Sequence, residues 1–219
     1  MYFTHFKKKS GQNFEPYQAY IRRAAEKFKL EILGGRKFAA MHWRYDAEDW
    51  MKMKIDNSER IHSVIERAEL YPKTFASSLE SQLLKENISV VYFASPPEEI
   101  QFLNVLGSYF EKVEFFTGSS LEDYFKRKFT FCPDILRDLV ENISLLEQEI
   151  CFISDFFIES CFSSWRWDKF EILIFISFSS NIVLERYAEG IRSNLNNLDI
   201  AAKGLGEKYE DSCFVRSFL

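Results

Sequence analysis

The sequence has little excess charge and few cysteines, and each shortage narrows the classes of protein to consider. Its 219 residues include 28 basic and 33 acidic residues, for a formal net charge of −5. This balance gives no electrostatic reason to expect a nucleic acid or an anionic membrane as partner. The four cysteines include no Cys-x-x-Cys pair, which disfavours a zinc site. Their even number permits disulfides without requiring them.

Several sequence signals are also missing. The longest apolar run, residues 170 to 178, is interrupted by Glu171 and is too short to span a bilayer, so no transmembrane segment is expected. The basic cluster near the amino terminus is not followed by an apolar stretch, so no signal peptide is visible. No Gly-x-Gly-x-x-Gly follows a predicted strand and no P-loop is present, which argues against a dinucleotide-dependent enzyme.

Aromatic residues, in contrast, are abundant. The chain has 23 Phe, and 47% of its residues are apolar while 28% are charged. This composition is that of a folded domain with a large core, and it argues against a disordered binding segment.

Apolar periodicity predicts strands that alternate with helices. Strands are expected at residues 37–42, 88–94, 113–117 and 155–160, and helices at 17–33, 57–70, 77–87, 98–112, 133–154 and 179–191. Gly34-Gly35 should end the first helix, and Ser77 or Ser78 should cap the third. The alternation predicts an α/β fold, a Rossmann-like parallel sheet with flanking helices. In such sheets, ligands bind at the carboxyl ends of the strands.

Three polar residues follow the first predicted strand, at alternate positions. His42, Arg44 and Asp46 would point the same way if the strand direction persists. A guanidinium can bind a phosphate through two hydrogen bonds, an imidazole can donate a further one, and the carboxylate can hold Arg44 or a ligand hydroxyl. In the alternative interpretation, which the spacing alone favours, Arg44 and Asp46 form a surface ion pair and His42 is a core residue.

Taken together, three segments resemble the protein O-fucosyltransferase family. They are EILGGRKFAAMHWRYDAEDW with its His-x-Arg motif, ISVVYFASPPEE, and EQEICFISDFFIESCFSSW, in which a strand preceded by Asp ends in Ser-Ser-aromatic. The helix SNIVLERYAEG, including Glu185-Arg186, resembles the next helix of the family. The match runs from about residue 15 to residue 195, with the motifs in order.

The resemblance implies a fold and an activity. The family has a GT-B architecture of two Rossmann-like domains, and its members transfer fucose from GDP-fucose to a Ser or Thr hydroxyl of a protein acceptor, with inversion and without a metal or other cofactor. This chain would correspond to the carboxy-terminal, donor-binding half, as a fragment. The resemblance also implies a location in the lumen of the endoplasmic reticulum or Golgi.

The resemblance assigns Arg44 the catalytic role, because it would neutralise the charge that grows on the β-phosphate as GDP departs. His42 would contact the diphosphate of GDP-fucose, and Asp46 is a further match at the donor site. Asp155 matches an acidic residue that accepts hydrogen bonds from guanine. Its alternative role is that of a carboxylate at the start of a strand, capping nearby N–H groups.

The segment Ser163, Ser164 and Trp165 matches the family's phosphate-binding turn, although the two serines could simply cap a helix. Residues 166 to 179 interrupt the family pattern, and we interpret them as a retained intron or a genuine insertion. The predicted organisation is a helical lead-in over 1–36, a GDP-fucose-binding domain over 37–200 and a tail over 201–219.

The sequence leaves two questions open. The chain could instead be an inactive nucleotide-sugar-binding fragment or pseudoenzyme that acts through protein interactions. Two glycosylation sequons, Asn87-Ile88-Ser89 and Asn142-Ile143-Ser144, would matter only in the secretory pathway.

Overall fold

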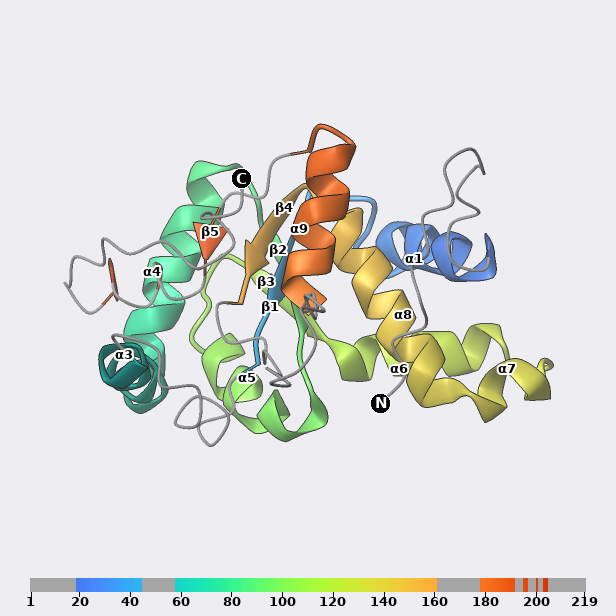
Figure 1. The fold of residues 1–219 in the computed structure, drawn as a ribbon, viewed down its shortest axis with the longest axis horizontal. Coiled ribbons are helices and arrows are strands. Elements are labelled where there is room, and N and C mark those ends of the chain that lie inside the picture. The colour runs from blue at the N-terminus through green and yellow to red at the C-terminus, as the bar shows by residue number, and fades with distance from the viewer. Residues whose placement is uncertain are drawn as a thin grey trace, which may run out of the picture.

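The structure, a computed structural model, describes residues 19–44, 58–160, 178–191, 195–196, 200 and 203–204. In this part of the chain, one parallel sheet of five strands lies between two layers of helices (Figure 1). The strands are β1 (Ala39–His42), β2 (Val90–Ala94), β3 (Glu114–Thr117), β4 (Phe156–Glu159) and β5 (Leu195–Asn196). The α/β class and the parallel sheet are therefore confirmed.

The strand order is β3-β2-β1-β4-β5, and all four pairings are parallel. The same order describes five of the six strands in the Rossmann arrangement. The chain builds β1, β2 and β3 in one direction and then returns to the other side of β1 to add β4. The register pairs Met41 of β1 with Phe93 of β2 and with Ile158 of β4.

Helices cover both faces of this sheet. On one face lie α3 (Ser58–Leu70), α4 (Pro72–Lys85) and α5 (Ile100–Gly107), the last preceded by the short 3-10 helix η1 (Pro97–Glu99). On the other face lie α1 (Ala19–Glu31), α6 (Gly118–Lys128), α7 (Pro133–Arg137), α8 (Leu139–Phe152) and α9 (Phe178–Ala188). None of the helices in the described residues is both long and apolar enough to cross a bilayer.

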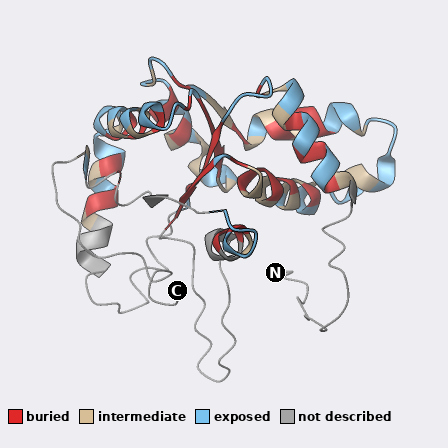
Figure 2. Cartoon of the chain, turned by 90° about the horizontal axis from the view of Figure 1, so that it is seen from above, coloured by how far each residue is buried: buried red, intermediate tan, exposed pale blue. Residues whose placement is uncertain are grey.

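Alternation along the strands divides the buried side chains into two cores. Ala39 and Met41 face the core beneath α3, α4 and α5, whereas Phe38 and Ala40 face the core beneath α1, α6 and α8. Figure 2 shows buried residues along the strands and on the helix surfaces that turn toward them. The central strands therefore carry continuous apolar runs, because both faces of a parallel sheet are covered.

The first predicted helix and the first predicted strand are confirmed. Helix α1 gives way to a turn in which Gly34 and Gly35 have φ of 68° and 64°. This left-handed conformation suits glycine and ends the helix where the sequence predicted. Strand β1 then begins within the predicted segment.

Some predicted boundaries are wrong. Helix α4 begins at Pro72, which occupies a first-turn position where its missing N–H costs no hydrogen bond, so Ser77 and Ser78 lie inside the helix and do not cap it. The hydroxyl of Ser78 donates instead to the carbonyl oxygen of Ile200 at 3.0 Å. The helix predicted over 98–112 ends at Gly107.

The long helix predicted over 133–154 is two helices. Asp138, with φ −100° and ψ 37°, leaves the helical region and separates α7 from α8. Two elements have no counterpart in the sequence prediction, namely α6 and the short edge strand β5. Helix α6 follows β3 directly, and its apolar residues Leu121, Tyr124 and Phe125 are spaced as expected for a helix packed on the sheet.

Candidate active site at the β1/β4 edge

The reversal of chain direction between β3 and β4 creates a switch point at β1. The helix that follows β1 covers one face of the sheet and the helices that precede and follow β4 cover the other. At the carboxyl ends of β1 and β4 the connections therefore diverge, and this is where open parallel sheets bind their ligands. These carboxyl ends, called the β1/β4 edge, carry His42, Arg44, Glu159 and Ser160.

The backbone around Arg44 is held from two sides. The N–H of Trp43 donates to the carbonyl oxygen of Ala94 at the end of β2, at 2.9 Å. The buried Trp43 indole donates from Nε1 to Oε2 of Glu99 at 3.2 Å. On the other side, the hydroxyl of Ser160 donates to the carbonyl oxygen of Arg44 at 3.3 Å. Arg44 itself is exposed, so a fixed backbone presents a solvent-accessible cation at the switch point.

His42 is buried at the end of β1, with 4% of its surface exposed. Burial, and secondarily the positive charge of Arg44, lower the pKa of His42 to about 3. At neutral pH the imidazole is therefore uncharged, with one nitrogen that donates and one that accepts. The arrangement separates two roles, because Arg44 supplies the charge and His42 can supply only a neutral hydrogen bond.

Glu159 and Ser160 were not predicted as site residues. Glu159 is 8% exposed and ends β4 beside the carboxyl end of β1. By strand alternation its side chain lies on the same face of the sheet as Phe157, which is also the face of Ala40 and His42. The signal was available in the sequence, since FFIES, like AAMHWR, is an apolar strand that ends in polar residues.

Asp155 lies at the opposite, amino-terminal end of the same two strands. Its carboxylate Oδ2 accepts a hydrogen bond from the N–H of Phe38 at 3.1 Å and is 3.4 Å from Nζ of Lys29. Phe38 precedes β1, whereas Arg44 follows it, and the four residues of β1 alone span about 13 Å. The structure thus does not bring Asp155 together with His42 and Arg44, and the contact with Phe38 is the capping that the alternative interpretation describes.

The remaining predicted site residues lie outside the described residues. These are Asp46 and the segment Ser163, Ser164 and Trp165. The same holds for the predicted insertion over 166–179, except that its last two residues, Phe178 and Ser179, begin α9.

Arg186 belongs to the Glu185-Arg186 pair that the resemblance singled out. Its role in this structure is to hold elements of the fold together. The side chain is fully buried, and Nη1 donates to the carbonyl oxygens of Phe152 and Ser154, both at 2.7 Å. A cation at the carboxyl end of α8 also complements the helix dipole. Arg186 therefore fixes α9 to the junction of α8 and β4, at the edge of the sheet away from Arg44.

Glu147 on α8 is a carboxyl with a raised pKa. The hydroxyl of Tyr92 donates to Oε1 of Glu147 at 2.9 Å, and a Cβ added at Gly118, the first residue of α6, would lie 3.1 Å from the same oxygen. Burial raises the pKa of Glu147 to about 8, against a smaller lowering by the Tyr92 hydrogen bond. The sequence held a signal for this residue too, because Glu147 occupies the same helix face as Ile143 and Ile150.

A surface groove lies elsewhere in the described residues, and a metal-ion site is not found there. A groove of about 470 Å³ runs along α4 between Lys73 and Lys85 and is closed on its other side by Tyr109 and Glu111. In the part of the chain that the structure describes, no three His, Cys, Asp or Glu side chains form a group that could hold a metal ion.

No protein-family model matches the sequence, no curated protein matches it, and no solved structure matches the chain.

Proposed function

We propose that the β1/β4 edge binds the diphosphate of a sugar nucleotide and that the chain acts as the donor-binding half of a GT-B glycosyltransferase. The observation that carries this proposal is the exposed guanidinium of Arg44 at the switch point, directly after the buried, uncharged His42. A planar cation there suits two phosphate oxygens, and its charge would stabilise the departing nucleoside diphosphate. The fucosyltransferase resemblance adds GDP-fucose as donor and a protein Ser or Thr hydroxyl as acceptor.

The proposal treats the two parts of the donor differently. Recognition of the diphosphate is supported by Arg44 and His42, which the fold holds at one edge. Recognition of guanine was expected from Asp155, but this carboxylate bonds to Phe38 at the far edge. The identity of the base therefore rests on the resemblance alone, and Asp155 is not part of the proposed site.

Calorimetric titration with GDP, GDP-fucose and ADP tests the proposal. We expect saturable binding of both guanine nucleotides with dissociation constants of about 1 to 100 μM, which corresponds to roughly 5 to 8 kcal/mol of binding free energy. Inorganic phosphate is the control for simple charge attraction and should bind far more weakly. Failure of all three nucleotides to bind at millimolar concentration would refute the proposed site.

A second candidate function is nucleotide-sugar binding without transfer. The separation of Asp155 from Arg44 favours it, since one of the donor contacts expected of an active family member lies elsewhere. A transfer assay with radiolabelled GDP-fucose and folded acceptor modules distinguishes the two functions. Nucleotide binding with no product would support the binding protein, and labelled acceptor would support the transferase.

A further inference from the structure

The two glycosylation sequons occupy opposite environments in the fold. Asn87 lies in the turn between α4 and β2, is exposed, and has φ of 58°. Asn142 lies in the first half of α8 and is only 6% exposed. The tripeptides are alike in sequence, with Ile in the middle and Ser in the third position, so the fold alone separates them.

The amide of Asn142 is used inside the fold. Its Oδ1 accepts a hydrogen bond from the hydroxyl of Tyr20 at 2.7 Å, and its Nδ2 donates to the carbonyl oxygen of Ile135 at 2.8 Å. These bonds join α8 to α1 and to α7. A glycan on Nδ2 would need space that the buried amide does not have, and a chain modified there could not pack these helices in this way.

The turn at Asn87 has the opposite properties. Its N–H donates to the carbonyl oxygen of Leu84 at 3.1 Å, as the last turn of α4 unwinds, and its left-handed backbone is one that asparagine tolerates well. The third sequon residue, Ser89, is also exposed. The groove along α4 begins at Leu84 and Lys85, so the surface next to the turn is hollowed and open.

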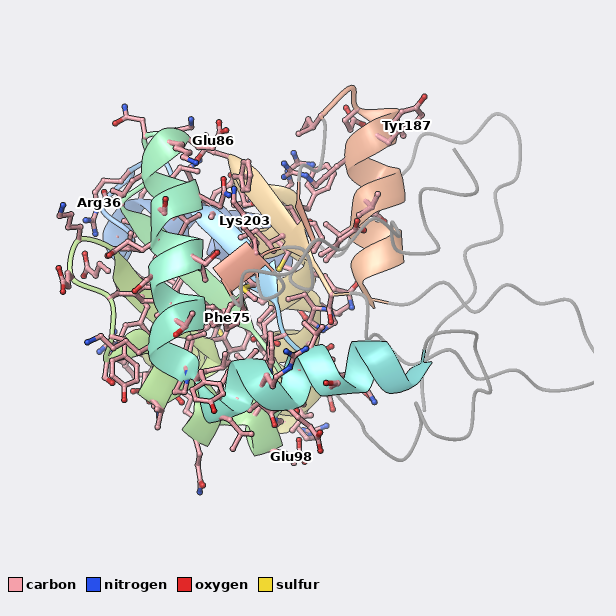
Figure 3. The ribbon with its side chains drawn as sticks, turned by 90° about the vertical axis from the view of Figure 1, so that its left-hand side faces the viewer. Arg36, Phe75, Glu86, Glu98, Tyr187 and Lys203 are labelled. Atoms are coloured by element: carbon pink, nitrogen blue, oxygen red, sulfur yellow. The ribbon has the colours of Figure 1, made fainter. Side chains whose placement is uncertain are left out.

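The position of the turn also separates it from the proposed nucleotide site. Asn87 precedes β2, whereas Arg44 follows β1, so the two lie at opposite edges of the sheet. Figure 3 shows Glu86, the neighbour of Asn87, at one end of the molecule and Glu98, which follows β2, at the other. A substituent on Asn87 would therefore leave the Arg44 edge accessible.

We propose that Asn87 is an N-glycosylation site of the folded chain and that Asn142 is not. The reaction joins Nδ2 of Asn87 to C1 of the first sugar of a lipid-diphosphate-linked oligosaccharide. The bond between C1 and the diphosphate oxygen breaks, the lipid diphosphate leaves, and Nδ2 loses one proton to a base of the transferring enzyme. The inference rests on the lumenal location that belongs to the proposed function.

The test uses the full chain behind a cleavable signal sequence, secreted from cultured animal cells. Release of glycans by peptide-N-glycosidase in heavy-oxygen water converts each modified Asn to a mass-labelled Asp, which peptide mass spectrometry then locates. We expect the label at Asn87 in most molecules. Unmodified Asn87, or a label at Asn142 in secreted and protease-resistant chain, would overturn the proposal.

Two matched variants each remove one sequon and keep its asparagine. Ser89→Ala and Ser144→Ala both change an exposed serine. Ser89→Ala should abolish the gel shift on deglycosylation, and Ser144→Ala should leave it unchanged. GDP titration of the same preparations separates this inference from the proposed function, because a chain that binds GDP but carries no glycan contradicts the inference alone.

Discussion

Asp155 and Phe38 bond to each other twice. The carboxylate of Asp155 accepts a hydrogen bond from the N–H of Phe38 at 3.1 Å, and the N–H of Asp155 donates to the carbonyl oxygen of Phe38 at 3.0 Å. The pair closes the amino-terminal edge of the sheet between β1 and β4, and Lys29 of α1 adds an ion pair at 3.4 Å. Asp155 thus aligns the two strands whose other ends carry the proposed site.

This contact predicts that Asp155→Asn affects stability rather than nucleotide choice. The variant loses the charge that strengthens both the hydrogen bond to Phe38 and the attraction to Lys29. Because these groups are partly exposed, we expect the free energy of unfolding to fall by about 1 kcal/mol. Urea denaturation measures the change, and Asp134→Asn, in an exposed ion pair with Arg137, is the control with a smaller effect. Loss of preference for GDP over ADP in the folded variant would instead show that Asp155 takes part in nucleotide recognition.

Arg44→Ala should weaken nucleotide binding without unfolding the chain. Loss of a charged hydrogen-bond donor should weaken GDP affinity by at least roughly tenfold and remove any transfer activity. Since Arg44 is exposed, the free energy of unfolding should stay within about 0.5 kcal/mol of the parent. The matched control is Arg23→Ala, an exposed arginine on α1. Equal GDP affinity in the Arg44→Ala variant and the parent would exclude Arg44 from the site.

Glu147 should make the fold less stable in alkaline solution. Its pKa is raised from 4.5 to about 8 by burial, so the folded chain holds a proton that the unfolded chain has lost. The resulting stabilisation is full below the unfolded pKa and is lost as pH rises through the folded pKa. Between about pH 7 and pH 9 the free energy of unfolding should fall by about 1 kcal/mol on this account.

Glu147→Gln should flatten that dependence, since Gln can still accept the Tyr92 hydrogen bond and does not titrate. Urea titrations at the two pH values provide the measurement, and Glu141→Gln, an exposed carboxyl on the same helix, should retain the parent slope. The chosen window avoids the opposite effect of His42, whose lowered pKa costs stability only in acid, as pH falls below its unfolded value of 6.5. An unchanged slope in Glu147→Gln would contradict this account of Glu147.

Gly107 at the end of α5 should not tolerate a side chain. A Cβ at this position would lie 2.5 to 2.6 Å from three ring atoms of Phe115 on β3, so the ring would have to move. We expect Gly107→Ala to lower the free energy of unfolding by about 1 to 3 kcal/mol, against a helix-propensity gain of less than about 1 kcal/mol.

A double-mutant cycle tests the cause of this loss. If the Phe115 ring is responsible, Gly107→Ala should cost less in a Phe115→Leu background than in the parent. Thermal or urea unfolding of the four proteins gives the coupling free energy. Equal costs in both backgrounds would assign the loss to the backbone of α5 instead.

Much of the fold could be predicted because local signals agreed with the tertiary arrangement. The β-branched and aromatic run of β2, the glycines after α1 and the alternation of strands with helices each fix a nearby feature. Where a local signal had a competitor, prediction failed. Ser77 and Ser78 looked like caps, but Pro72 begins α4 five residues earlier. The helix pattern over 133–154 continues through Asp138, whose backbone angles interrupt it.

For the site, too, one part could be predicted from the sequence and another part could not. That His42 and Arg44 follow a buried strand was evident from the sequence, because an apolar run that ends in polar residues reports the end of a strand. Which strand ends meet was not evident from the sequence. Asp155 and Glu159 belong to one strand segment, yet parallel pairing brings only Glu159 to the edge of Arg44 and carries Asp155 to the edge of Phe38.

The sequence by itself determined the class of fold, the two-sided burial of the central strands and the polar residues at their ends. These follow from the period of apolar residues and from the chemistry of single side chains. The tertiary structure decided which of those polar residues share an edge, which of two identical kinds of sequon is exposed, and which carboxyl holds a proton near neutral pH. Each of these depends on strand direction, register and desolvation, which arise only when segments distant in the chain pack together.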